Sequence, residues 1–200
     1  MSESHSFNSS SLSQRQGVMV VVVGPSGAGK DTLMEFAAAR LGQQHNIHFA
    51  RRVITRNRDA GGEDHDAVTQ EEFHRRHEQG DFSVSWQAHG LSYGIPASVQ
   101  DRLKLGDIVI ANGSRSALAH FRSAFPVLKV INVIATPDVL AARLESRGRE
   151  SRDDILRRLQ RSSLDVCGDF DVTTIDNSGE LAVAGAAFAK LLEKQLGRCL

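Results

Sequence analysis

Residues 21–36, VVVGPSGAGKDTLMEF, contain the most informative pattern in this chain. The pattern is G-x-x-x-x-G-K. In this motif a glycine-rich loop directs backbone N–H groups toward phosphate oxygens, and the lysine side chain reaches the same oxygens. Residues 18–23 before it are almost all β-branched, as is typical of a strand buried on both faces of a parallel sheet. Helical spacing follows over residues 30–41, and Gly42 ends it. We therefore predict a strand, a phosphate-binding loop and a helix in direct succession.

The loop predicts a bound nucleoside triphosphate, with Lys30 on its β- and γ-phosphates. The alternative is a glycine-rich turn that binds no ligand. The residues expected to contact the nucleotide are Gly24, Pro25, Ser26, Gly27, Ala28, Gly29, Lys30, Asp31 and Thr32.

One residue of the loop departs from the usual pattern. A Ser or Thr hydroxyl normally follows the lysine and ligates Mg²⁺, whereas this chain has the carboxylate of Asp31. A carboxylate beside a triphosphate is repelled unless a cation lies between them. Asp31 is therefore predicted to hold Mg²⁺ directly or through water, with Thr32 as a candidate second contact. Alternatively, Asp31 only complements the positive end of the helix.

The composition restricts the kind of partner. The chain has 24 basic and 24 acidic residues and a net charge of +0, so no overall field favours nucleic acid or a membrane surface. Nineteen of the 24 basic residues are Arg, whose planar fork binds phosphate oxygens in pairs. The two cysteines show no metal or disulfide spacing, and no apolar run suits a signal peptide or a membrane span. We expect a cytoplasmic protein with a small-molecule partner, and the oligomeric state stays open.

The rest of the chain alternates strands and helices. Residues 1–16 are predicted to be a disordered Ser-rich tail, and residues 17–200 to form one domain. Alternation of this kind predicts an α/β fold, a doubly wound parallel sheet with helices on both faces. The predicted strands are 18–23, 47–54, 107–111, 127–135 and 172–175, and the predicted helices are 30–41, 96–105, 115–124, 137–146, 153–166 and 180–196.

Residues 55–95 interrupt this alternation. A polar loop is followed by a short helix that begins at a capping box formed by Thr69 and Glu72. The sequence FSVSWQAHGLSYG, residues 82–94, then predicts an antiparallel hairpin. We expect this segment to be a small insert that closes over a ligand.

The motifs of the chain, taken in order, resemble those of guanylate kinases over nearly everything after the tail. They are GPSGAGKDTL, TRNR, GDFSVSW with HGLSYG, TPDVLAARLESRG, ILRRL and FDVTTIDN. The resemblance implies a P-loop core of the nucleoside-monophosphate-kinase type, an inserted acceptor-binding subdomain at about 55–95 and a helical lid at about 143–158. It also implies ATP and Mg²⁺ as cofactors and a phosphate group as the acceptor.

The resemblance assigns roles in the insert. Arg56 and Arg58 match the family's two arginines on the acceptor phosphate, and Tyr93 matches one of its two phosphate-binding tyrosines. His65 replaces the other tyrosine. His65 is therefore either a contact of the acceptor phosphate or a solvated loop histidine.

Arginines of the expected lid complete the predicted catalytic set. Arg143 and Arg147 are i, i+4 neighbours on one helix face, and Arg158 matches a further lid arginine of the family. With Lys30, they would neutralise charge on the transferred phosphoryl group. No general base is needed, because an acceptor phosphate is already ionised at neutral pH. The alternative for the arginines is a solvated helix face.

The positions that hold the base in guanylate kinases differ here. Ser85 stands where the family has an acidic residue before the Trp, and Arg52 and Ile95 replace two serines near the base. A guanine site cannot lose such partners cheaply, since each buried unpaired polar group costs about 1 to 3 kcal/mol. A second cation where the base would lie indicates a second phosphate on the acceptor. Arg52 and Arg115 are the candidates for binding it.

This pattern, with NGSR at residues 112–115, is similar to that of the ribose 1,5-bisphosphate phosphokinases, which are related to guanylate kinases. The resemblance implies transfer of the γ-phosphoryl group of ATP to the 1-phosphate of ribose 1,5-bisphosphate, giving 5-phosphoribosyl diphosphate (PRPP), and a role in phosphonate metabolism. Two alternatives stay open: a guanylate kinase with a divergent base pocket, and a non-catalytic guanylate-kinase-like interaction module.

Overall fold

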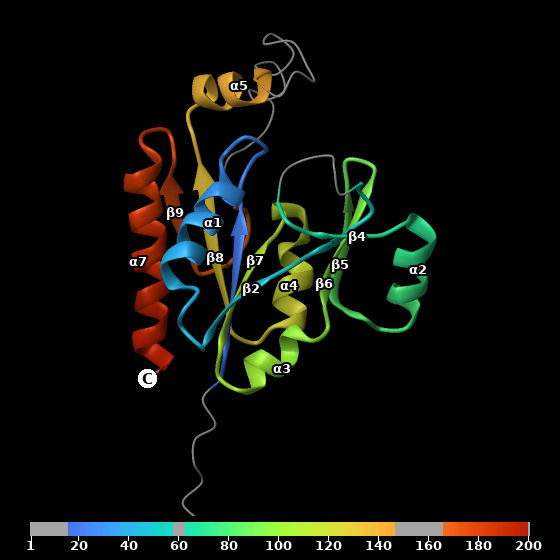
Figure 1. Cartoon of the computed structure of the whole chain (residues 1–200). Helices are drawn as coiled ribbons and strands as arrows, with labels where there is room; N and C mark the ends of the chain where they lie inside the picture. Colours follow the sequence, from blue (N-terminus) through green and yellow to red (C-terminus); the bar gives the residue numbers. More distant parts are fainter. Residues whose placement is uncertain (1–15, 58–62, 147–165, 200) are drawn as a thin grey trace, which may run out of the picture.

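A computed structural model describes residues 16–57, 63–146 and 166–199, which form two sheets with helices around them (Figure 1). The core sheet has five strands in the order β2-β7-β1-β8-β9, all parallel. The predicted doubly wound α/β fold is confirmed. The core strands are β1 (Val18–Val23), β2 (Ile47–Ala50), β7 (Ile108–Asn112), β8 (Leu128–Ile134) and β9 (Val172–Asp176).

Helices cover both faces of the core sheet, because the side chains of the central strand β1 alternate between them. Its even-numbered valines pack with α1 (Lys30–Leu41), α5 (Pro137–Glu145) and α7 (Leu181–Cys199). Its odd-numbered residues pack with α3 (Val99–Lys104) and α4 (Leu118–Ala124). All six residues of β1 are buried, which explains the continuous apolar run in the sequence.

The insert is a second, smaller sheet with one helix, to the right of the core in Figure 1. Strand β3 (Val53–Ile54) pairs with β4 (Asp66–Ala67) and with β6 (Leu91–Pro96). Strands β5 (Phe82–Ala88) and β6 form the predicted hairpin. Helix α2 (Gln70–Glu78) begins at the predicted cap, where the Thr69 side chain accepts a hydrogen bond from the backbone N–H of Glu72 at 3.1 Å.

One element prediction is wrong. Residues 47–54 were expected to form a single strand, but the segment divides into β2 at the edge of the core sheet and β3 in the insert. Each half contributes apolar residues to its own sheet, so the sequence pattern does not show the change of partner. Arg51 and Arg52 lie at the crossing between the two sheets. The helix predicted at 153–166 and the tail predicted at 1–16 fall, apart from one residue each, outside the residues that the structure describes.

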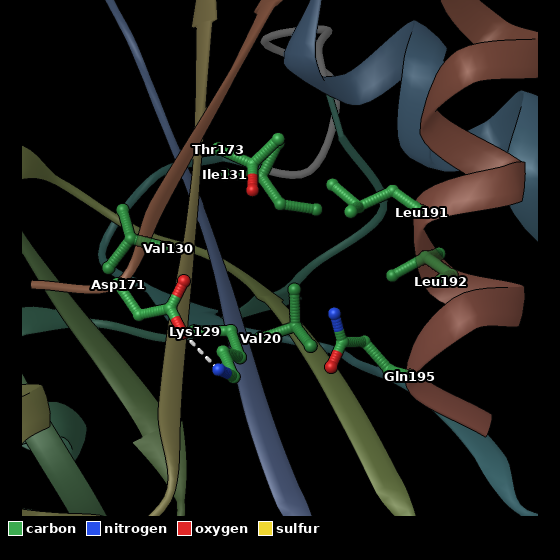
Figure 2. A pocket seen from close by; sticks show the side chains of 9 residues that line it. All are labelled: Val20, Lys129, Val130, Ile131, Asp171, Thr173, Leu191, Leu192 and Gln195. Carbon is green, nitrogen blue, oxygen red and sulfur yellow. Dashed lines mark hydrogen bonds and ion pairs between the residues drawn. The ribbon is translucent and has the colours of Figure 1, made fainter. Parts of the chain in front are cut away.

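A small hollow lies between β8, β9 and α7 (Figure 2). Its volume is about 20 Å³, enough for one water molecule. Lys129 and Asp171 form an ion pair at its edge. The hollow contains none of the predicted site residues. None of the helices in the described part of the chain is both long enough and apolar enough to cross a membrane.

Candidate active site

The phosphate loop joins the end of β1 to the start of α1, at the centre of the carboxyl edge of the core sheet. Gly24 and Gly29 have φ angles of 146° and 85°, which side-chain-bearing residues rarely adopt. A Cβ atom at Gly24 would lie 2.1 Å from the carbonyl oxygen of Val133. One at Gly29 would lie 2.4 Å from Nδ2 of Asn177. The Val133 backbone therefore leaves no room for a side chain at Gly24, and at Gly29 the positive φ angle and the Asn177 side chain favour glycine.

Lys30 is folded over its own loop. Its Nζ donates hydrogen bonds to the carbonyl oxygens of Gly24 and Pro25 at 3.0 and 3.1 Å. Burial lowers the pKa of Lys30 to about 8. The carboxylates of Asp31 and Glu63 oppose that shift, whereas the Arg52 guanidinium adds to it. The amine thus lies among charged groups from both the loop and the insert.

One pocket joins the phosphate loop to the insert. The loop contributes Gly24, Ser26, Lys30, Asp31 and Thr32 to its lining. The insert contributes Arg52, Arg56, Glu63, Trp86, His89 and Tyr93, and the end of β7 contributes Asn112 and Ser114. A phosphate donor on the loop and an acceptor on the insert would therefore meet in a single cavity, as direct phosphoryl transfer requires.

Arg52 is held tightly in this pocket. It is only 8% exposed, and its guanidinium carbon lies 5.0 Å from the ring centre of Tyr93 and 5.7 Å from that of Trp86. The two rings are themselves stacked, with centres 5.2 Å apart. Arg52 Nε donates to Glu63 Oε1 at 2.8 Å, and Nη2 contacts the same oxygen. The fixed, planar cation suits a phosphate ligand, and Glu63 balances its charge in this structure.

Two other predicted acceptor-binding residues line the same pocket. Nε of Arg56 is buried and has no hydrogen-bond partner among the residues with described positions. A buried donor without a partner is uncommon, and a ligand in the pocket that Arg56 lines would satisfy it. Tyr93 contributes its ring to the wall beside Arg52. Arg58 lies outside the described residues.

His65 is placed differently from the predicted phosphate contact. It is 2% exposed, and its ring nitrogens lie 2.9 Å from the carbonyl oxygen of Glu63 and 3.2 Å from that of Arg56. The ring therefore joins the two ends of the loop between these residues. It is also buried, so it is not the solvated loop histidine of the alternative reading. This placement favours a role in shaping the loop that carries Glu63.

Arg143 contacts the phosphate loop rather than the pocket. Its Nη1 donates to the carbonyl oxygens of Gly27 and Ala28, each at 3.4 Å, and its Nη2 donates to that of Asn177 at 2.9 Å. These contacts support the loop from α5, so Arg143 is not the solvated side chain of the alternative, and its predicted catalytic role stays a prediction. Arg147 and Arg158 lie outside the described part of the chain.

The residues at the guanine-recognition positions are dispersed. Ile95 is fully buried in the core. The Ser85 hydroxyl lies 3.3 Å from Nδ1 of His77 on α2, because successive side chains of β5 face opposite sides and its neighbour Trp86 takes the pocket side. Of the three substituted positions, Arg52 lines the pocket. Arg115 begins the 3₁₀ helix η2 (Arg115–Ala117), close enough to Lys30 for its charge to lower the pKa of that amine.

Sequence reasoning missed three polar residues that organise the site. Asn177 follows β9 and donates from Nδ2 to the carbonyl oxygen of Ala28 at 2.8 Å. Asn112 ends β7, and its Nδ2 donates to Asp31 and to Glu63. A signal was present for the two asparagines, because each comes at the carboxyl end of a strand, and these ends meet at one edge of a parallel sheet where ligands bind. Glu63 gave no such signal.

Comparisons with known proteins agree with this geometry. The family model described as guanylate kinase matches residues 16–194. The ribose 1,5-bisphosphate phosphokinase PhnN of Agrobacterium fabrum is 65% identical over 90% of this chain and 98% of its own length. The PhnN protein of Rhizobium etli is 57% identical over 89% of this chain and 90% of its own length. The crystal structure of guanylate kinase from Anaplasma phagocytophilum has the same fold, with a TM-score of 0.62 and 19% identity over 91% of this chain and 87% of that one.

The phosphate loop, the parallel sheet and the joint pocket define a P-loop kinase. The chain belongs to the guanylate kinase family and, within it, to the group of the ribose 1,5-bisphosphate phosphokinases. The predicted family resemblance is confirmed.

Proposed function

We propose that this chain transfers the γ-phosphoryl group of ATP to the 1-phosphate of ribose 1,5-bisphosphate, with 5-phosphoribosyl diphosphate and ADP as products. The joint pocket is the observation that supports this most directly, because the phosphate loop faces Arg52, Arg56 and Tyr93 across it. The names of the PhnN relatives support the choice of acceptor. A cytoplasmic location and a role in phosphonate metabolism belong to the same proposal.

The reaction needs positioning and charge neutralisation. An oxygen of the 1-phosphate attacks the γ-phosphorus of ATP, the bond to the bridging oxygen breaks, and ADP leaves with that oxygen. Lys30 neutralises charge on the transferred group, while Arg52 and Arg56 hold the acceptor phosphates. Mg²⁺, with Asp31 as a ligand, would supply further neutralisation at the β- and γ-phosphates. Arg58, His65, Arg115, Arg147 and Arg158 keep their predicted roles only as predictions, and the observed contacts of His65 do not favour a phosphate contact.

The pocket suits a second phosphate better than a purine base. Arg52 lies against the Trp86 and Tyr93 rings, so a fixed positive charge stands in the acceptor half of the pocket. The Ser85 hydroxyl, at the position of the family's base-recognising acid, contacts α2 instead. A guanine edge would therefore lose its acceptor at Ser85 and meet a cation at Arg52.

The proposal is tested by an ATP-consumption assay run side by side with ribose 1,5-bisphosphate and with GMP, following 5-phosphoribosyl diphosphate and GDP directly. Turnover of the sugar phosphate alone is expected. Turnover of GMP alone would establish the guanylate kinase alternative. Calorimetry with ATP and Mg²⁺ addresses the non-catalytic module, because failure to bind nucleotide would leave no donor site.

A further inference from the structure

Two carboxylates share one amide group at the junction of the phosphate loop and the insert. Asn112 Nδ2 donates to Asp31 Oδ1 at 2.6 Å and to Glu63 Oε2 at 3.1 Å. Asp31 belongs to the first turn of α1, Glu63 to the insert and Asn112 to the end of β7. Three segments far apart in the sequence therefore bring oxygen-bearing side chains to one point.

This arrangement is unexpected in a pocket that binds phosphates. Asp31 and Glu63 each add negative charge where the donor and acceptor phosphates would lie, and like charges at short range repel. The carboxylates are tolerable there if a cation lies between them and the phosphates. In this structure the Asn112 amide donates to both carboxylates, and Arg52 contacts the other oxygen of Glu63. These donors offset the negative charge.

Asn112 is the third polar group at this point, and its amide can present either its nitrogen or its oxygen to the carboxylates. It is 3% exposed, and its Oδ1 is buried without a hydrogen-bond partner in the described part of the chain. Such an atom costs stability unless something satisfies it. Rotation of the amide by half a turn exchanges Nδ2 and Oδ1. The oxygen would then face the gap between the two carboxylates.

The resulting donor set fits Mg²⁺. Two carboxylates and an amide oxygen are hard oxygen ligands, and Mg²⁺ in kinases is typically bound by one or two carboxylates together with substrate phosphates. The usual P-loop site combines a loop hydroxyl with an aspartate at the end of the neighbouring strand. Here the loop has the carboxylate, Asp31, and the neighbouring strand has the neutral Asn112. Asp31 and Asn112 together keep the single negative charge of the usual site, with its position exchanged, and Glu63 adds a second.

We propose that Asp31, Glu63 and Asn112 together form a divalent-cation site, in which Glu63 is a ligand supplied by the insert. The identification of the cation as the Mg²⁺ of the nucleotide complex rests on the proposed kinase function. Binding of the cation moves Glu63 from Arg52 to the metal. The Arg52 guanidinium is then free for the acceptor phosphate, so metal binding prepares the acceptor half of the pocket.

Mn²⁺ titration of the nucleotide-free full chain, followed by electron paramagnetic resonance, tests the site directly. The wild-type chain is expected to bind one Mn²⁺ at it. Glu63→Gln and Asp31→Asn are each expected to raise the dissociation constant by about tenfold or more, because each removes a charged ligand. Asp64→Asn is the matched control, since the Asp64 side chain is 81% exposed and paired with Arg51. Mn²⁺ binding by Glu63→Gln as tight as by Asp64→Asn, or no binding by the wild-type chain, would overturn the proposal.

A second measurement tests the release of Arg52. Ribose 1,5-bisphosphate binding is measured by calorimetry in EDTA, where the wild-type Glu63 holds Arg52. Glu63→Gln is expected to bind the acceptor several-fold more tightly than wild type under these conditions, and equal affinities would refute the exchange of partners. ATP binding in the presence of Mg²⁺, measured in parallel, reports on the kinase site separately. Its absence would count against the proposed function, whereas normal ATP binding with unchanged Mn²⁺ affinity in Glu63→Gln would count against the cation site alone.

Discussion

Lys30 shows how burial gives one side chain a titration range that matters for ligand binding. Its pKa is lowered from 10.5 to about 8, chiefly because the ammonium group is removed from water. Between about pH 8 and 10.5 the folded chain therefore binds fewer protons than the unfolded chain. The contribution of Lys30 to the unfolding free energy consequently rises with pH in that window, and the cost of the buried charge is greatest below pH 8.

Nucleotide binding is expected to reverse this shift, because phosphate oxygens beside Nζ favour its charged form. At pH 8.5 we expect the chain to take up most of one proton when ATP binds, and ATP affinity to fall as the pH rises above about 8. Calorimetry in two buffers of different ionisation enthalpy measures the uptake. The same titration at pH 7.5 is the control, where uptake by Lys30 should be much smaller. Equal uptake at both pH values would contradict the assignment.

Arg52 is predicted to determine acceptor affinity. Arg52→Ala should raise the Michaelis constant for ribose 1,5-bisphosphate by about 10- to 100-fold, since charged hydrogen bonds contribute about 1.5 to 3 kcal/mol. Arg51→Ala is the control, because Arg51 pairs with Asp64 at 2.8 Å and Asp66 at 3.2 Å. The Michaelis constant of Arg52→Lys should lie between those of Arg51→Ala and Arg52→Ala, because lysine keeps the charge and loses the planar fork. An unaltered constant in Arg52→Ala would exclude this role.

At the scale of elements, the phosphate loop is supported from behind by its neighbours. Asn177, after β9, and Arg143, on α5, both donate hydrogen bonds to the Ala28 carbonyl. Both side chains thus fix loop backbone without lining the pocket. This division explains how a loop rich in glycine keeps one conformation.

Removing one of these supports should affect nucleotide binding selectively. Asn177→Ala is expected to lower the melting temperature and to weaken ATP binding several-fold, since an under-satisfied buried carbonyl costs about 1 to 3 kcal/mol. The Michaelis constant for the acceptor should stay unchanged. Ser178→Ala is the control, because the Ser178 hydroxyl contacts the Thr136 backbone and Asp176 rather than the loop. Thermal unfolding and ATP calorimetry measure the effects, and equal behaviour of the two variants would argue against the support.

For the whole molecule, the two faces of the core sheet have different relations to the site. Phe121 and Phe188 are both fully buried, on opposite faces. Phe121, on α4, packs against Trp86 of the insert with ring centres 5.8 Å apart. Phe188 packs between α7 and the sheet, in the cluster that contains α1. One face therefore connects the core to the acceptor half of the pocket, and the other does not.

Matched substitutions separate stability from acceptor binding. Phe121→Leu and Phe188→Leu should each lower the unfolding free energy by about 1 to 2 kcal/mol, measured by urea denaturation. Phe121→Leu should also raise the Michaelis constant for the acceptor, because Trp86 and the stacked Tyr93 lose a supporting ring. Phe188→Leu should leave that constant unchanged. An unchanged Michaelis constant in Phe121→Leu would show that the insert is positioned independently of α4.

The strand and loop that bind phosphate, and the start of α2 in the insert, could be predicted accurately because their signals are local. The β-branched run of β1, the glycines after it and the helix cap at Thr69 each depend on neighbours within a few residues. The division of residues 47–54 between two sheets could not be predicted in this way. Apolar alternation reports that a strand is buried, and it does not report which sheet buries it.

In the candidate site, too, local features could be predicted from the sequence and contacts between distant residues could not. The motif and its order fixed the class of chemistry, since Lys30, the loop glycines and the arginines of the insert are residue types that bind phosphate wherever they meet. The contacts of Asp31 with Asn112 and of Arg52 with Glu63, and the turn of Arg143 toward the loop, required the folded chain. These partners lie 81, 11 and 115 positions apart in the sequence. Their proximity follows from strand order and loop closure, because a parallel sheet gathers the carboxyl ends of distant strands at one edge.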